Sequence, residues 1–126
     1  MYIGTDLCNP RRIEKVYKRF GRKFLKRILT ENEIQELEKN TGKLGVIHRL
    51  TGRFAAKEAL AKLFMTGIGK DLSFQDIEIF KDPANGSPLV KLSIKAQKLA
   101  ISKNIKEIKV SISHEDTMVM AVAIAS

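Results

Sequence analysis

The stretch Gly52-Arg53-Phe54-Ala55-Ala56-Lys57-Glu58-Ala59 lies at the centre of the longest helical pattern in the chain, which runs from about Gly45 to Met65. At about 100° per residue, Lys57 falls inside the apolar arc of this helix, with Arg53 and Glu58 at its margins. Burial of a lone charge is costly unless the charge is paired or binds a metal. The stretch therefore predicts a central helix that carries either a structural ion network or a functional site.

The chain before this helix predicts one strand followed by short helices. Tyr2 to Asp6 has strand character, and Asn9-Pro10 supplies an N-cap and a proline at the first position of a helix from about Arg11. Thr30-Glu31-Asn32-Glu33 resembles a capping box, which predicts a helix over residues 31–39.

After the central helix the apolar period changes to two, which is typical of strands. The predicted elements are a hairpin with strands at 77–80 and 89–92, a helix at 93–103, and a second strand pair at 108–114 and 118–125. These elements predict an α+β fold in which a small, mainly antiparallel sheet packs on a long helix. With 126 residues the chain is long enough for one domain, spanning 1–126.

The last predicted strand is apolar at every position from Met118 to Ala125. Such a strand needs cover on both faces. One face can pack on helices of the same chain, and we expect a second copy of the chain to cover the other, which predicts a homo-oligomer. The alternative is a strand in the middle of the chain's own sheet.

Composition excludes several classes of protein. The hydrophobic fraction is 44%, too high for a disordered chain, and no apolar run approaches the roughly 20 residues of a membrane span. The start of the chain does not resemble a secretion signal. The single cysteine, Cys8, can form neither an internal disulfide nor a cysteine zinc site. These features exclude a secreted or membrane-spanning product and favour a protein of the reducing cytoplasm.

The positive charge is concentrated in one segment. The chain carries 23 Lys and Arg against 14 Asp and Glu, for a net charge of +9. Residues 11–27 hold nine of the basic residues and one acid, Glu14, for +8, and Gly21 interrupts the predicted helix there. This segment predicts a basic face for nucleic acid, a membrane or an acidic protein. A merely solvated helix face is the alternative.

Asp6 and Glu58 form a candidate metal pair. Asp6 ends the first predicted strand, where a carboxylate often serves only as a local turn acceptor. Two carboxylates together are the sparse protein ligand set that Mg²⁺ prefers, with water and substrate phosphate oxygens as the other ligands.

Four segments carry a resemblance that spans the chain. They are Gly4-Thr5-Asp6, the central stretch 52–59 with Thr66-Gly67-Ile68-Gly69, Asp76-Ile77-Glu78-Ile79 leading to Asn85-Gly86-Ser87-Pro88, and Val110-Ser111-Ile112-Ser113-His114. In this order and spacing they resemble the bacterial holo-acyl-carrier-protein synthases, a group of 4′-phosphopantetheinyl transferases. The central stretch is the most specific of the four.

The resemblance implies the phosphopantetheinyl transferase fold and a Mg²⁺-dependent reaction. The 4′-phosphopantetheine group of coenzyme A would pass to a serine of apo acyl carrier protein in fatty acid biosynthesis, leaving adenosine 3′,5′-bisphosphate. Asp6 and Glu58 would hold Mg²⁺, and Glu58 and Lys62 would be the catalytic residues, with Lys62 facing the phosphates. The base that accepts the serine proton stays open between a metal-bound water, Glu58 and a nearby acid such as Glu33.

The resemblance also implies where the substrates bind. Coenzyme A would lie between adjacent subunits of a homotrimer. The residues expected to contact it are Arg53, Lys57 and His114 at the nucleotide end, and Asn85, Gly86 and Pro88 on the adenine side. His114 follows Val110 and Ile112 on one strand face, so a core histidine is its alternative, and Asn85-Gly86 is a turn first.

The basic segment would dock the acidic carrier protein. The residues we expect to contact it are Arg12, Arg19, Arg22 and Lys23. Two other classes of function are the alternatives. A small basic nucleic-acid-binding module lacks stacking aromatics, because only Tyr17 and Phe20 interleave with the basic residues. A scaffold that only oligomerises leaves the charged residues of the central helix unexplained.

Overall fold

The structure is a computed structural model that describes residues 1–39 and 45–126. Its elements are β1 (Tyr2–Cys8), α1 (Pro10–Phe20), α2 (Arg22–Ile28), α3 (Glu31–Lys39), α4 (Val46–Leu63), the short 3-10 helix η1 (Phe74–Asp76), β2 (Ile77–Lys81), β3 (Pro88–Leu92), α5 (Ile94–Ser102), β4 (Ile108–His114) and β5 (Val119–Ala125). Every predicted element is present, and β1 extends two residues beyond its predicted end.

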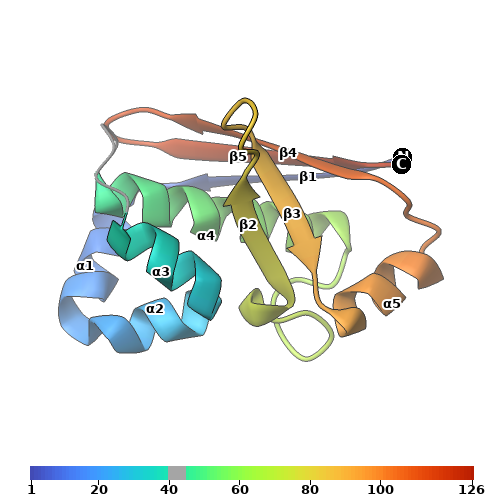
Figure 1. Cartoon of the computed structure of the whole chain (residues 1–126), viewed down its shortest axis with the longest axis horizontal. Coiled ribbons are helices and arrows are strands. Elements are labelled where there is room, and N and C mark those ends of the chain that lie inside the picture. Colours follow the sequence, from blue (N-terminus) through green and yellow to red (C-terminus); the bar gives the residue numbers. More distant parts are fainter. Residues whose placement is uncertain (40–44) are drawn as a thin grey trace.

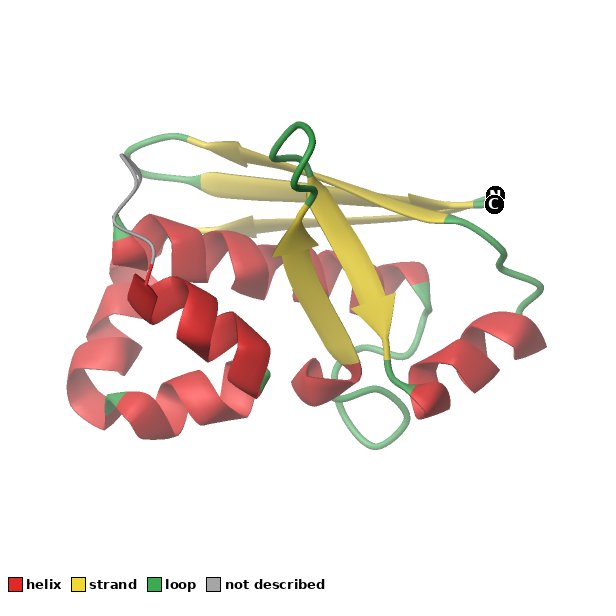
Figure 2. Ribbon diagram, viewed as in Figure 1, coloured by secondary structure: helices red, strands yellow, loops and turns green. Residues whose placement is uncertain are grey.

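The strands form two antiparallel units over the central helix. Sheet order is β1-β5-β4 in the larger unit, and β2 and β3 form the hairpin. Figure 1 shows α4 running beneath the larger sheet, with α1, α2 and α3 gathered at one end and α5 at the other. Figure 2 shows the same separation of helices from strands. The predicted α+β class with a small antiparallel sheet on a long helix is confirmed.

Helix α4 is the core of the molecule. It is buried on nearly every side, including at Ala55, Ala56 and Ala59, so the predicted single apolar arc was too narrow. At Gly4 of β1 a Cβ would lie 1.9 Å from the carbonyl oxygen of Ala59. Only glycine permits this approach, and it seats β1 directly on the α4 backbone.

The helix boundaries follow the predicted local signals. Asn9 caps α1, because its side chain accepts a hydrogen bond of 2.9 Å from the Arg11 backbone N–H. Gly21 has a φ of 57° at the corner between α1 and α2. Both halves of the capping box at Thr30 and Glu33 are formed. Helix α4 ends at Leu63, slightly before the predicted end near Met65, and Met65 itself adopts a φ of 62°.

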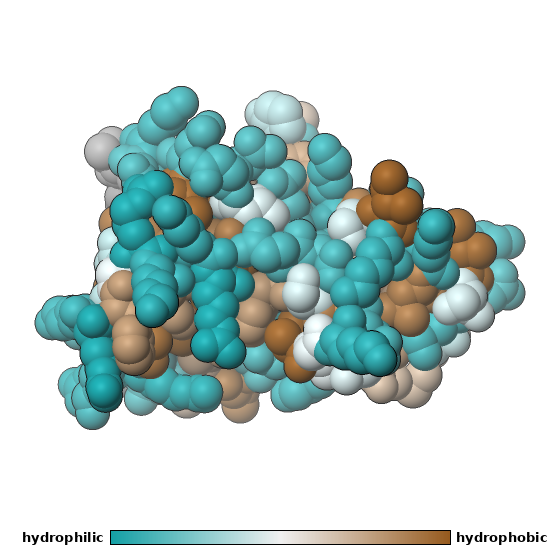
Figure 3. Space-filling model, turned by 90° about the horizontal axis from the view of Figure 1, so that it is seen from below, coloured by the Kyte–Doolittle hydropathy of each residue, from teal (hydrophilic) through white to brown (hydrophobic). Residues whose placement is uncertain are grey.

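The outer face of the sheet is apolar and open. The inner-facing residues of β5 pack on α4, whereas Ile3 and Leu7 of β1 are 67% and 62% exposed and Met120 and Ile124 of β5 are 41% and 42% exposed. The paired register places Ile3 beside Ile124 and Leu7 beside Met120. The opposite side of the molecule, viewed from below in Figure 3, is mostly hydrophilic over the N-terminal helices. Among the described helices, none is both long and apolar enough to span a membrane.

Candidate functional site

Asp6, Glu58 and Lys62 come together between β1 and α4, and we call them the carboxylate site. Asp6 lies on the inner face of β1, opposite Ala121 of β5. The Lys62 Nζ lies 3.3 Å from Asp6 Oδ1, and the side chain of Lys62 is 56% exposed. Glu58 is half-buried one turn before Lys62. Because β1 packs closely on α4 at Gly4, Asp6 and Glu58 lie near each other although they are 52 positions apart in the chain.

The surroundings of the carboxylate site disfavour the ionised form of Glu58. Burial raises the pKa of Glu58, the neighbouring Asp6 raises it further, and Lys62 and Arg12 lower it. The pKa of the buried Cys8 thiol is also raised by burial, with the same carboxylates adding to the effect. Two neighbouring carboxylates repel each other when both are ionised, and a cation between them relieves this repulsion. No group of three or more His, Cys, Asp and Glu side chains able to hold a metal occurs among the described residues, so the candidate ligand set is the pair.

The basic segment adjoins the carboxylate site. Arg12 lies in the first turn of α1, close enough to Glu58 to lower its pKa. Arg19, Arg22 and Lys23 are exposed farther along α1 and α2. Arg19 lies over the ring of Phe20, 5.2 Å from its centroid, and Phe20 is 50% exposed. An exposed basic surface with an aromatic side chain therefore leads directly to the carboxylates.

Lys57 precedes Glu58 in the chain, but its side chain is completely enclosed by the protein. It is fully buried, and its ammonium donates to Glu33 Oε1 at 2.5 Å, to the Ile28 carbonyl at 2.8 Å and to the Phe74 carbonyl at 3.0 Å. Burial lowers the pKa of Lys57, and Glu33 opposes that shift. For Lys57 the structure favours the ion-network alternative over contact with a nucleotide, because each ammonium proton has an acceptor within the chain.

Arg53 belongs to the same group, which we call the buried ion cluster. Glu33, Lys57 and Arg53 are buried in it, and Glu36 lies partly exposed at its edge. The Nη2 of Arg53 lies 3.1 Å from Glu36 Oε1, and its Nε lies 3.7 Å from Glu33 Oε2. The Nε has no hydrogen-bond partner among the described residues, although the side chain is only 8% exposed. Arg53 is thus held by carboxylates of α3 and retains one unsatisfied donor.

His114 ends β4 beside α4. A Cβ on Gly52 would lie 2.9 Å from the His114 Nε2, so the glycine of the central stretch makes room for the imidazole. Burial lowers the pKa of His114, and so does nearby His48. The Nε2 of His48 lies 3.1 Å from the Glu115 carbonyl oxygen. His114 keeps an exposed side and can meet a ligand there.

Asn85, Gly86 and Pro88 lie at the turn between β2 and β3. Gly86 has a φ of 75°, and the Asn85 side chain accepts a hydrogen bond of 2.9 Å from the Ser87 backbone N–H. The turn projects beyond the larger sheet in Figure 1. Within one chain it stands apart from the carboxylate site, which lies between β1 and α4.

The sequence missed the part played by α3. Glu36 was not singled out, and Glu33 was considered only as a possible base. Glu33 is 1% exposed and fully engaged, so it offers no oxygen to an incoming serine. The capping box was the available signal, but it gives no indication that the same carboxylate reaches α4.

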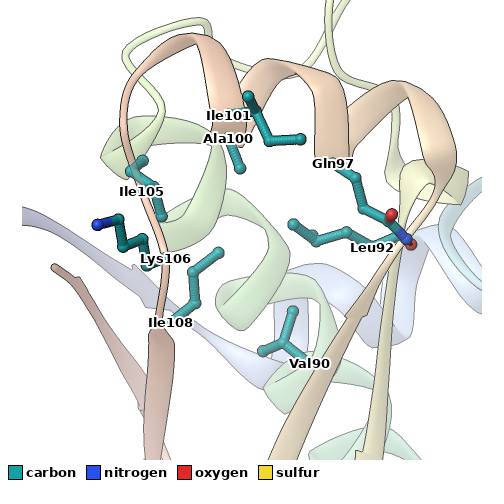
Figure 4. Close-up of a pocket in the computed structure, with 8 residues that line it drawn as sticks. All are labelled: Val90, Leu92, Gln97, Ala100, Ile101, Ile105, Lys106 and Ile108. Atoms are coloured by element: carbon teal, nitrogen blue, oxygen red, sulfur yellow. Dashed lines mark hydrogen bonds between the residues drawn. The ribbon is translucent and has the colours of Figure 1, made fainter.

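The structure also contains an apolar pocket between β3, α5 and β4. Figure 4 shows Val90 and Leu92 facing Ala100 and Ile101 across it. None of the predicted site residues lines this pocket. The candidate site is therefore the α4 region and not this hollow.

Comparison with known proteins decides the family. A model described as the 4′-phosphopantetheinyl transferase superfamily matches residues 2–123. The chain belongs to this superfamily. The holo-[acyl-carrier-protein] synthase of Ruminiclostridium cellulolyticum is 42% identical over 126 residues, which are 100% of this chain and 92% of that protein. That of Helicobacter pylori strain G27 is 41% identical, covering 98% of this chain and 96% of that protein.

Solved structures agree with the sequence relatives. The holo-[acyl-carrier-protein] synthase of Neisseria meningitidis superposes with a TM-score of 0.90 at 35% identity, covering 99% of this chain and 97% of that chain. The Helicobacter pylori enzyme in complex with coenzyme A has a TM-score of 0.83 at 40% identity, covering 98% and 99%. The transferase is thus an enzyme of the holo-[acyl-carrier-protein] synthase type, and the resemblance read from its four segments is confirmed. These relatives give no support to the nucleic-acid-binding alternative.

Proposed function

We propose that this transferase moves 4′-phosphopantetheine from coenzyme A to a serine of apo acyl carrier protein, in the cytoplasm and in support of fatty acid biosynthesis. The serine oxygen forms a bond to the phosphorus that bears the pantetheine, and the bond from that phosphorus to the bridging pyrophosphate oxygen breaks. Holo-carrier protein and adenosine 3′,5′-bisphosphate are the products. Full-length similarity to holo-[acyl-carrier-protein] synthases, one of them in complex with coenzyme A, carries this proposal.

The carboxylate site fits Mg²⁺. Burial and the neighbouring Asp6 both raise the pKa of Glu58, so its anion gains from a nearby cation. Hard carboxylate oxygens are the ligands that Mg²⁺ takes from proteins. When bound, the ion supplies charge neutralisation at the pyrophosphate. Asp6 and Glu58 are the residues that would hold it.

Lys62 and Glu58 would act on different atoms of the substrates, Lys62 on a phosphate oxygen and Glu58 on the serine proton. Lys62 is exposed and reaches Asp6 with one ammonium proton, so it can turn toward a phosphate oxygen of the leaving group as a mobile point charge. Glu58 is half-buried beside the basic segment and, unlike Glu33, keeps a side open to an incoming serine. We assign Glu58 as acceptor of the serine proton, in preference to the enclosed Glu33.

Coenzyme A would bind between subunits of a homotrimer. The hairpin turn with Asn85 and Gly86, which leads to Pro88, projects beyond the larger sheet of its own chain, and the open apolar sheet face offers a surface for another copy. A partner's turn could then meet the carboxylate site. His114 would contact the nucleotide end, and Arg53 would reach a phosphate only by exchanging the Glu36 carboxylate for it.

The basic segment would dock the carrier protein. Arg12, Arg19, Arg22 and Lys23 are exposed on α1 and α2, and Arg12 lies beside the carboxylate site. An acidic partner bound along these helices would bring its serine toward Glu58.

The test is intact-mass analysis of an apo acyl carrier protein incubated with the transferase and coenzyme A. One sample contains Mg²⁺ and its matched sample contains EDTA as well. We expect the mass of the carrier to rise by one phosphopantetheine in the Mg²⁺ sample alone. An unchanged mass with several carriers, from folded and oligomeric protein, would refute the reaction, and an equal gain with EDTA would refute the metal dependence.

A further inference from the structure

Glu33 lies where three parts of the fold meet. Its Oε1 accepts hydrogen bonds from the Thr30 backbone N–H at 2.9 Å and from Lys57 Nζ at 2.5 Å. Its Oε2 accepts one from the Ile79 backbone N–H at 3.1 Å. One carboxylate, 1% exposed, thereby joins the start of α3, the middle of α4 and strand β2.

The bond from Glu33 to Lys57 fixes α4 in direction as well as in position. The Lys57 ammonium donates to the Ile28 carbonyl at the end of α2 and to the Phe74 carbonyl in η1, besides Glu33. Three protons meet three acceptors from three different segments. Rotation or sliding of α4 would break at least one of these buried hydrogen bonds, each of which is costly to lose.

Glu58 lies between this polar attachment and the close backbone contact of α4 with β1. Lys57 precedes it in α4, and Ala59 follows it with the carbonyl oxygen that would be 1.9 Å from a Cβ on Gly4. Asp6 lies two residues beyond Gly4 in β1 and on the same sheet face. The separation of Glu58 from Asp6 is therefore set on one side by backbone contact with β1 and on the other by the bonds of Lys57.

We infer that Glu33 is a positioning residue of the transfer site, acting through Lys57 to hold Glu58 and Lys62 in register with Asp6. This inference rests on the proposed function. Glu33 itself is enclosed and touches no substrate. Its effect on the reaction comes from the fixed orientation of α4, and a misplacement of about 1 Å at a reacting group can cost 100-fold in rate.

The test compares three variants. Glu33→Gln leaves the Lys57 charge buried without its carboxylate and turns an amide NH₂ toward backbone N–H donors. Glu33→Gln with Lys57→Gln removes both charges and keeps hydrogen-bonding groups, but the shorter side chain at 57 cannot span the same acceptors. The matched control is Glu31→Gln, which makes the same charge change at an exposed position of α3.

Three quantities are measured below the unfolding transition: stability to denaturant, kcat and KM for transfer, and Mg²⁺ binding by calorimetry without substrates. We expect Glu33→Gln to lower kcat about 10- to 100-fold, with KM for the carrier unchanged because the basic segment is intact. The double variant should regain stability over Glu33→Gln, since no unpaired charge is buried, while kcat and Mg²⁺ affinity stay low. Glu31→Gln should match the parent protein.

Other outcomes overturn the inference. If kcat and Mg²⁺ affinity return together with stability in the double variant, Glu33 contributes to stability alone. The same conclusion follows if folded Glu33→Gln turns over like Glu31→Gln. Absence of transfer by the unaltered protein refutes the proposed function instead, and is recognised because the parent, the control and both variants then fail alike.

Discussion

Two neighbouring residues of α4, Lys57 and Glu58, carry opposite charges and face two differently built surroundings. On the side of α3 the buried ion cluster encloses Lys57, whose ammonium protons all have acceptors within the chain. On the side of β1 the carboxylate site leaves Glu58 half-buried beside a second carboxylate, with Lys62 exposed to solvent. One helix thus carries a lysine whose donors are all satisfied and a carboxylate that still borders solvent.

The difference shows which observation separates a structural charge from a functional one. Both groups contain charged residues of the same helix, and both lie partly or wholly out of water. In the carboxylate site, burial and then the neighbouring Asp6 raise the pKa of Glu58, against the opposing effect of Lys62 and Arg12. In the buried ion cluster each carboxylate lies against a cation. An unsatisfied excess charge can be relieved by a ligand, whereas a satisfied pair gains nothing from one.

The largest expected effect comes from opening the buried ion cluster. Lys57→Met keeps the side-chain length but removes the charge, so the buried Glu33 carboxylate loses its hydrogen-bonded cation and keeps only the more distant Arg53. We expect the free energy of unfolding to fall by roughly 3–5 kcal/mol, measured by denaturant titration. Lys98→Met on the exposed surface of α5 is the control. A loss no greater than that of the control would contradict the structural role.

Substitutions in the carboxylate site should lower activity and leave stability intact, in contrast to those in the buried ion cluster. Asp6→Asn and Glu58→Gln each remove one negative charge from the candidate metal ligands without changing side-chain size. We expect either to lower kcat about 100-fold or more, measured by the carrier mass assay. Full activity in either variant would remove that residue from the site.

The difference in stability between Glu58→Gln and the parent protein should change with pH in a defined direction. The pKa of Glu58 is raised in the folded protein, so the native state holds its proton more tightly than the unfolded state does. Stability therefore declines as pH rises from the usual carboxylate range through the raised folded pKa. At neutral pH the variant should be at least as stable as the parent, and a clear loss in denaturant unfolding would contradict this expectation.

The basic segment is expected to have a smaller effect, confined to one substrate. Replacing Arg19 and Arg22 together by Glu should raise KM for the carrier about tenfold at low salt and leave coenzyme A binding unchanged. The difference should shrink as salt screens the exposed charges. Lys98→Glu with Lys106→Glu, the same charge change near α5, is the control. An equal rise in KM for both pairs would indicate net charge rather than a docking surface.

Much of the fold was predictable because its signals are local. The N-cap at Asn9, the corner at Gly21 and the capping box at Thr30 and Glu33 each depend on a few adjacent residues, and each is present. The period of the strands and the length of the central helix were equally readable. The surroundings of α4 were not, since its burial on nearly every side depends on how separate elements pack.

The candidate site was predictable in its residues but not in their grouping. Asp6, Glu58 and Lys62 were named together, and the structure places them together. Lys57 and Arg53 were expected beside the nucleotide, yet the structure pairs both with carboxylates of α3. Helical spacing gives the direction of a side chain from its own helix, but it does not show which other segment supplies the partner.

The smallest expected effect concerns His114, which belongs to neither group on α4. Its pKa is lowered first by burial and then by His48, so in mildly acidic solution the unfolded state binds a proton that the folded state does not. Stability should therefore fall as pH drops through the usual histidine range. His114→Gln should flatten this fall between about pH 7 and pH 5, measured by denaturant unfolding at each pH. His48→Gln should instead raise the pKa of His114, measured by NMR titration. An unchanged pH dependence of stability in His114→Gln would contradict the first expectation, and an unchanged pKa of His114 in His48→Gln would show that the two imidazoles do not interact.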